Sequence, residues 1–111
     1  MTNNKLFRLL GNLDKKAKKE LVLFSCSPLY NKNKDVIKLA DLLCSTRKVY
    51  DGGIESKKKI FQYLYPGRNY NDGRIRNLFS LLYGLAKKFV VVSYVTENRI
   101  LYSKTLAERF S

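Results

Sequence analysis

Apolar residues recur at helical spacing in the second half of the chain, and polar residues fill the positions between them. The clearest stripe follows Asn71 and Asp72, either of which can cap a helix because its side-chain oxygen accepts a free backbone N–H. Steps of three and four residues place the apolar members on one face, which predicts a long helix with one buried side. The stripe consists of Ile75, Leu78, Phe79, Leu82, Leu85, Ala86 and Phe89.

The opposite face of this helix is polar. A glycine in its middle, Gly84, lowers helix stability by about 1 kcal/mol relative to alanine. Two interpretations stay open: Gly84 allows another backbone to approach closely, or the fold simply tolerates it. The exposed positions are expected to be Arg76, Asn77, Ser80, Gly84, Lys87 and Lys88.

Four shorter helices are predicted before it. Glu55–Tyr65 carries an apolar pattern with Ser56 as its cap, and Pro66 ends it because the residue before proline avoids helical geometry. Gly67 then lets the chain reverse. The other three are a helix over Asn4–Leu10 that ends at Gly11, a helix capped by Asp14 that ends at Ser27-Pro28, and a helix capped from Tyr30–Asn33 whose stripe is Val36, Leu39, Ala40 and Leu43.

The last part of the chain supports two interpretations. Val90–Val95 favours extended structure, which predicts a short β segment near 89–95. The residues from Thr96 onward form either the second strand of a hairpin or a final helix, and we prefer a helix over Glu97–Phe110. The expected fold is therefore an all-α, compact bundle of about five or six helices with a helix-turn-helix or winged-helix-like core.

Composition fits one globular domain over residues 1–111. The charge is unusual, because 22 Lys and Arg face 9 Asp and Glu for a net +13. Such a field attracts nucleic acid, anionic lipid or an acidic protein, although it can also serve only to keep the protein soluble. The most apolar run, Phe89–Val95, is too short to span a bilayer, and no secretory segment follows Met1. We therefore expect a cytoplasmic protein without membrane insertion.

Ligands for metal or covalent chemistry are few. The chain has two cysteines, Cys26 and Cys44, and no histidine, so a zinc site or a Cys–His nucleophile has too few partners. Both cysteines are expected to be small buried apolar residues. The acidic residues Asp72, Glu55, Glu97 and Asp41 show no pairing in sequence. We expect no catalytic residue, no metal and no cofactor, and hence a protein that is not an enzyme.

Several segments together resemble a known family. Phe24–Asp35 is similar to a signature F-x-x-S-P-Y-F-N-K, and Ile60–Leu82 is similar to I-F-x-x-L-F-P-G-x-x-Y-N-D-x-x-L-R-N-x-x-S-x-L. The pair Leu29-Tyr30 departs from the usual aromatic pair. These segments resemble the N-terminal region of uncharacterised, largely helical bacterial proteins, over roughly Leu13 to Val95. The resemblance implies a fold region without an activity, and a chain that is the N-terminal part or a short relative of a longer helical protein.

Two functions compete on this evidence. The first is a protein-interaction or scaffold domain, with a protein partner or a second copy bound through the C-terminal helix. The second is a basic, winged-helix-like nucleic-acid-binding domain that uses the helix from Asp72. Its candidate contacts are Lys57, Lys58, Lys59, Arg74, Arg76, Asn77, Ser80, Lys87 and Lys88.

Overall fold

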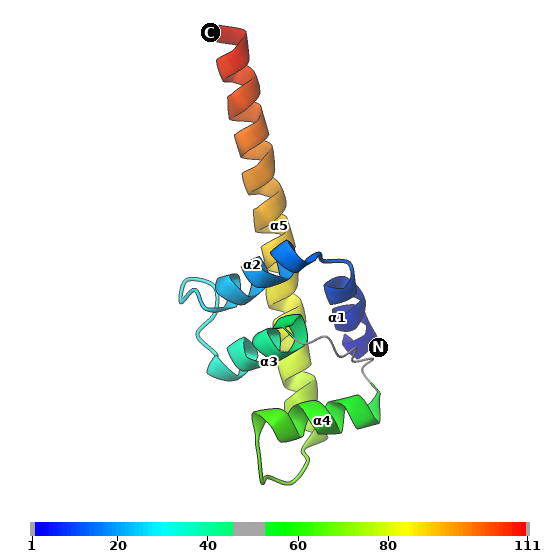
Figure 1. Cartoon of the computed structure of the whole chain (residues 1–111). Coiled ribbons are helices and arrows are strands. Elements are labelled where there is room, and N and C mark those ends of the chain that lie inside the picture. The colour runs from blue at the N-terminus through cyan, green and yellow to red at the C-terminus, as the bar shows by residue number, and fades with distance from the viewer. Residues whose placement is uncertain (1, 46–52, 111) are drawn as a thin grey trace.

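Five α-helices make up the part of the chain that the structure describes (Figure 1). The computed structural model describes the backbone of residues 2–45 and 53–110, and the side chains of 5–45 and 53–94. The prediction of an all-α bundle of about five or six helices is confirmed. The helices are α1 (Thr2–Gly11), α2 (Lys15–Ser25), α3 (Lys34–Ser45), α4 (Ile54–Leu64) and α5 (Asp72–Phe110).

The long helix α5 is the axis of the molecule. It packs against each of the other four helices, while α2 also packs on α3 and α3 on α4. In Figure 1, α4 crosses α5 near its first turns, and the opposite end of α5 projects clear of the globule. This projection makes the molecule elongated, with principal extents of 63 × 25 × 23 Å.

The core forms around the predicted stripe of α5. All seven of its apolar residues are buried, and Leu82 is fully so. Two aromatic contacts attach the outer helices to this stripe: Phe7 of α1 meets Phe79 edge-on at 5.5 Å, and Phe24 of α2 meets Phe89 at 5.6 Å between ring centroids. The other helices contribute Leu6, Leu10, Leu21, Val36, Leu39, Ala40, Leu43, Ile60, Phe61 and Leu64.

Three of the four predicted caps are confirmed. Asp14 accepts the Ala17 N–H at 2.7 Å, and Asn33 accepts the N–H groups of Asp35 and Val36 at 2.9 and 3.3 Å. Asn71 rather than Asp72 caps α5, since its Oδ1 accepts the Arg74 N–H at 3.0 Å. These are the short polar side chains that satisfy free N–H groups at a helix start.

Ser56 is not the cap of α4, so that prediction is wrong. The helix begins at Ile54 with Gly53 in the cap position, and Ser56 lies inside its first turn. The Lys57 N–H donates to the Gly53 carbonyl at 2.9 Å, and this bond closes a first turn that already contains the serine. Glu55 falls in this turn, where a negative charge is favourable to the helix dipole.

The short β segment predicted near 89–95 is also wrong. Residues 89–95 are helical, and α5 continues without interruption to Phe110. The preferred helix over Glu97–Phe110 is therefore confirmed as part of α5. The described residues form no strand, so the winged form of the predicted core has no wing among them.

Cys26 is exposed, contrary to the expected burial. The helix α2 ends at Ser25, one residue before it, and the buried Ser25 takes the inward position. The Ser25 hydroxyl donates to the Val22 carbonyl at 2.6 Å, which satisfies the polar group inside the fold. Cys44 is half-buried on α3, closer to the expectation.

Candidate functional site

The junction between α4 and α5 sets the direction of the long helix. Tyr65, which precedes Pro66, has a non-helical backbone (φ −132°, ψ 70°), as the steric effect of proline requires. Gly67 follows with φ +77°, a left-handed conformation that favours glycine. The chain therefore reverses over a few residues and enters α5 at its Asn71 cap.

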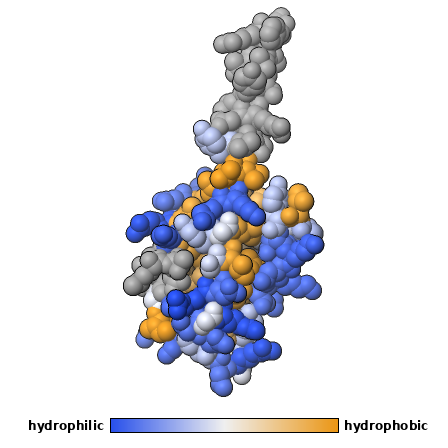
Figure 2. Space-filling model, turned by 180° about the vertical axis from the view of Figure 1, so that it is seen from behind, coloured by the Kyte–Doolittle hydropathy of each residue, from blue (hydrophilic) through white to orange (hydrophobic). Residues whose placement is uncertain are grey.

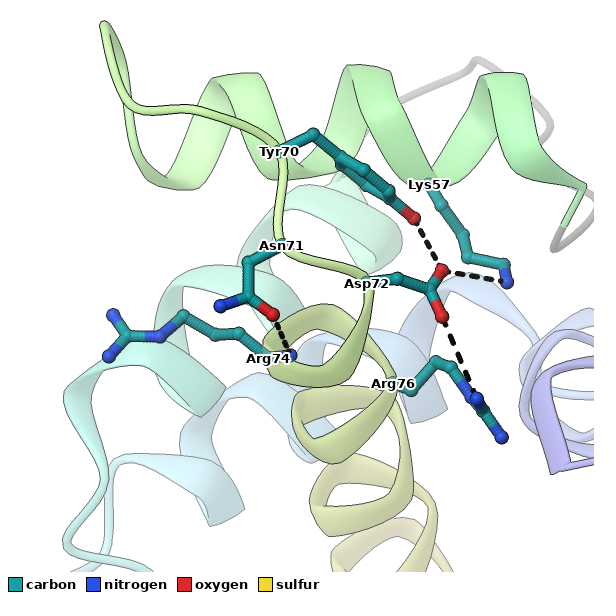
Figure 3. Close-up of polar contacts among 6 residues, drawn as sticks. All are labelled: Lys57, Tyr70, Asn71, Asp72, Arg74 and Arg76. Atoms are coloured by element: carbon teal, nitrogen blue, oxygen red, sulfur yellow. Dashed lines mark hydrogen bonds and ion pairs between the residues drawn. The ribbon is translucent and has the colours of Figure 1, made fainter.

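Asp72 ties this junction together with three partners (Figure 3). It accepts a hydrogen bond from the Tyr70 hydroxyl at 2.7 Å and one from Lys57 Nζ at 3.4 Å, and it pairs with Arg76 at 3.6 Å. The bond from Tyr70, followed by the two cations, lowers the pKa of the Asp72 carboxyl. Burial and the Asp72 bond raise the pKa of Tyr70 to about 12. This arrangement holds α4, the loop and the first turn of α5 in one position.

A second tyrosine, Tyr65, has two arginine side chains close to its ring beside the junction. Its hydroxyl donates to Asp35 of α3 at 2.6 Å, while the guanidinium carbons of Arg74 and Arg68 lie 5.1 and 6.0 Å from its ring centre. Such distances are those of cation–π contacts. Both arginines line an open cavity of about 470 Å³ at the start of α5, together with Phe61, Gly67, Asn69 and Asn71.

Most of the predicted nucleic-acid contacts share the outer side of α5. Arg76, Asn77, Ser80, Lys87 and Lys88 are exposed along it, and Arg74 is exposed at its start. The Lys87 ammonium lies 4.6 Å from the ring centre of Tyr83. Because no Asp or Glu occurs between Gly73 and Tyr94, this side of the helix is basic over its whole length within the globule.

The three predicted lysines of α4 differ in exposure and in partners. Lys58 and Lys59 are exposed, but the Lys57 side chain is only 15% exposed and is engaged with Asp72. Lys57 is therefore a structural group at the α4–α5 junction. The structure places it at the first turn of α5, where it pairs with Asp72, and its role in nucleic-acid binding stays a prediction.

A groove beside α5 was not predicted from the sequence. It has a volume of about 340 Å³ and lies between the loop after α2 and two turns of α5. The only signal for it in the sequence is Gly84, which lies in its floor. Its lining consists of Tyr30, Asn31, Asn33, Val36, Ser80, Leu81, Gly84, Leu85 and Lys88.

Groups for metal or thiol chemistry do not gather in the described part of the chain. No cluster of three metal-ligating side chains occurs there. Burial raises the pKa of the Cys44 thiol to about 11, against a smaller opposing effect of Lys18. None of the described helices has the length and apolar character needed to cross a membrane.

Comparisons of the chain with protein-family models, with curated proteins and with solved structures found no match. The resemblance noted from the sequence motifs thus stays a prediction.

Proposed function

We propose that this protein is a non-catalytic binding module, an interaction or scaffold domain whose docking element is the projecting part of α5. One observation carries the proposal. Among the side chains that the structure describes, Phe89 is the last buried one of α5, yet the helix backbone continues over residues 90–110. At 1.5 Å per residue this adds about 30 Å of helix beyond the core.

The base of this projection is apolar. Val90, Val91 and Tyr94 are 39%, 61% and 65% exposed, and Figure 2 shows apolar surface where the projection leaves the globule. Most of the stability of a helix in a protein comes from packing of its apolar side, so an uncovered apolar projection is poorly stabilised. Residues Ile100, Ala107 and Phe110 continue the pattern in sequence, although their side chains lie outside the described residues.

The charge distribution favours a second copy of the chain as the occupant. Residues 95–111 carry a net charge of only +1 by sequence, with Arg99, Lys104 and Arg109 against Glu97 and Glu108. The remaining +12 belongs to residues 1–94, so electrostatic repulsion between two copies arises mainly from the globules. Antiparallel pairing of the projections places the globules at opposite ends, where repulsion is least. In the longer helical protein that the sequence resemblance implies, the same surface would meet the next helical layer.

Sedimentation velocity of the full chain over a concentration series tests this proposal. We expect a dimer whose population rises with concentration, and at least tenfold weaker association for Val91→Glu with Tyr94→Glu. The matched control is Tyr63→Glu, since Tyr63 is 57% exposed on α4, which crosses α5 near its first turns at the other end of the globule (Figure 1). A strict monomer at high micromolar concentration, or equal weakening by the control, would overturn the proposal.

Nucleic-acid binding is the second candidate, and the acid-free outer side of α5 specifically supports it. Exposed cations in this arrangement suit contacts to phosphates. Each such contact releases counterions from the nucleic acid, so binding becomes strongly salt-dependent. Fluorescence anisotropy with a generic DNA duplex should then detect binding at low salt that falls steeply as salt rises. Specific recognition would need Arg76 or Asn77 to reach base edges.

Two triple variants separate this candidate from general charge attraction. Arg74, Arg76 and Lys87 are changed to Glu in one, and the exposed α2 residues Lys15, Lys16 and Lys19 in the other. Both change the net charge equally. Loss of binding confined to the first variant supports the α5 surface. Equal loss in both shows that only net charge matters, and no binding at low salt removes the candidate.

A cytoplasmic location fits either function. Cys26 and Cys44 are both free thiols. Free thiols persist in reducing compartments, whereas secreted proteins tend to oxidise them to disulfides. This supports the location that we propose.

A further inference from the structure

No described residue packs closely against Gly84. It lies in the middle of α5, where glycine is a poor helix former, and its backbone has no positive φ that would require it. A Cβ atom built on Gly84 meets nothing within 4 Å. Of the two interpretations open from the sequence, close approach by another part of this chain is therefore excluded for the described residues.

Because Gly84 has no side chain, its backbone forms the floor of the groove beside α5. The groove follows the helix from Ser80 to Lys88, about 12 Å at 1.5 Å per residue. Its walls include apolar side chains that are partly open to solvent, Leu81 at 44% and Tyr30 at 39% exposed. A volume of about 340 Å³ is at the low end for ligand pockets, which suits one or two inserted side chains.

The wall opposite α5 is held rigidly by its own hydrogen bonds. Asn31 Nδ2 donates to the Ser25 carbonyl at 2.8 Å and to the Asn33 carbonyl at 3.2 Å. The Tyr30 ring stacks on Phe24 at 4.2 Å between centroids, and Phe24 in turn packs on Phe89 of the core. Because this wall is fixed in advance, an occupant would lose little free energy in ordering it.

The charge around the groove selects the chemistry of the occupant. Among the residues that the structure describes, Lys88 is the one charged side chain in its lining, and none of them that lines it is acidic. Lys32 and Lys34 are exposed next to the lining residues Asn31 and Asn33. The nearest acidic residue in sequence, Asp35 in the first turn of α3, accepts a hydrogen bond from the Tyr65 hydroxyl. Complementarity favours an occupant that combines an apolar side chain with flanking carboxylates.

We propose that this groove docks a short acidic segment of a partner protein, which inserts one bulky apolar side chain over Gly84 while its carboxylates face Lys88, Lys32 and Lys34. Recognition of an apolar anchor in a groove along a helix is a common mode of peptide binding. The groove is separate from the projecting part of α5. Docking here and self-association there are therefore distinguished by separate measurements.

The test uses the full chain and a displayed library of random peptides, selected on the wild-type protein alone. A Cβ atom at position 84 meets no described residue within 4 Å, so the variant Gly84→Leu should fold, which a denaturation curve verifies. Enriched peptides should carry one bulky apolar residue flanked by Asp or Glu. One of them, labelled with fluorescein, should bind wild type saturably and bind Gly84→Leu at least tenfold more weakly. Leu81→Ser and Lys88→Glu should each weaken it as well.

Gln62→Leu is the matched control, because it adds apolar bulk to an exposed position of α4, outside the groove lining. It should leave peptide affinity unchanged. Gly84→Ala should raise the denaturation midpoint, since the glycine does not serve the fold. The proposal is overturned if no peptide is enriched, if enriched peptides lack acidic residues, or if they bind Gly84→Leu as tightly as wild type. It is also overturned if the groove variants weaken binding of a DNA duplex instead.

Discussion

Leu82 is fully buried at the centre of the α5 stripe, and replacing it with alanine measures how much the long helix holds the fold together. The change removes three carbon atoms, worth about 2.4 kcal/mol at roughly 0.8 kcal/mol per buried CH₂. The cavity left behind adds to this, and measured costs of such changes run to about 5 kcal/mol. Because α5 contacts all four other helices, the site has little freedom to collapse. We expect a loss of about 3–5 kcal/mol in the free energy of unfolding.

Urea titration followed by circular dichroism measures this loss, with Leu81→Ala as the control. Leu81 is the adjacent residue and has the same side chain, but it is 44% exposed. Its truncation should lower stability by less than about 1 kcal/mol, since surface changes are usually small. The stripe would be misassigned if Leu82→Ala cost under about 1 kcal/mol or if the two variants were equally destabilised.

Three further outcomes are expected. The hydrogen bond from Tyr70 is the largest cause of the lowered pKa of the Asp72 carboxyl, so the contribution of Asp72 to stability is present above the unfolded pKa near 3.8 and is lost as pH falls further. Acid titration of Asp72→Asn should therefore show a smaller loss of stability below pH 4 than wild type. An unchanged profile would contradict this. Cys26 should react with a thiol reagent at pH 8 at least tenfold faster than Cys44, whose raised pKa and burial keep it protonated; equal rates would refute the described burial. Gly67→Ala should lower the free energy of unfolding by about 1 kcal/mol or more, because φ +77° strains an L residue; a neutral or stabilising effect in urea titration would show that the turn relaxes.

Features with local causes could be predicted from the sequence. The caps at Asp14, Asn33 and Asn71 depend on one side chain and the next few N–H groups, so the residue type almost determines the bond. The turn at Gly67 and the buried stripe of α5 follow in the same way from proline sterics and from helical periodicity. The prediction of Ser56 as the cap of α4 was wrong because Gly53, three residues earlier, occupies the cap position and the helix begins at Ile54.

The length of α5 was predicted incorrectly because propensity was given too much weight. Val90, Val91 and Val92 favour extended structure, but each disfavours a helix by only a few tenths of a kcal/mol. No glycine, proline or asparagine occurs between Leu85 and Glu97, so the sequence carries no strong signal to stop the helix. That missing stop signal was the evidence for a single long helix.

The groove could not be predicted at all. Its two walls, near Tyr30 and near Leu81, lie about 50 positions apart in sequence, and only tertiary packing brings them together. Gly84 marked an unusual residue type for the middle of a helix, but it did not indicate which other segment of the chain would lie across the groove from it. The basic side of α5 was predictable residue by residue, whereas the engagement of Lys57 with Asp72 depends on how α4 crosses α5.

The packing of every helix on α5 has a consequence for synthesis of the chain on the ribosome. The helices α1 to α4 emerge first, and their apolar sides have no complete partner until the stripe up to Phe89 has been made. At about 5–20 residues per second, the interval from Leu64 to Phe89 lasts roughly one to five seconds.

During that interval the nascent segment 1–71 carries a net charge of +9 by sequence, from 15 Lys and Arg against 6 Asp and Glu. Mutual repulsion between such chains opposes their association through the uncovered apolar sides. The strongly basic composition thus works against aggregation of the incomplete chain before α5 is complete, independently of any partner of the finished protein.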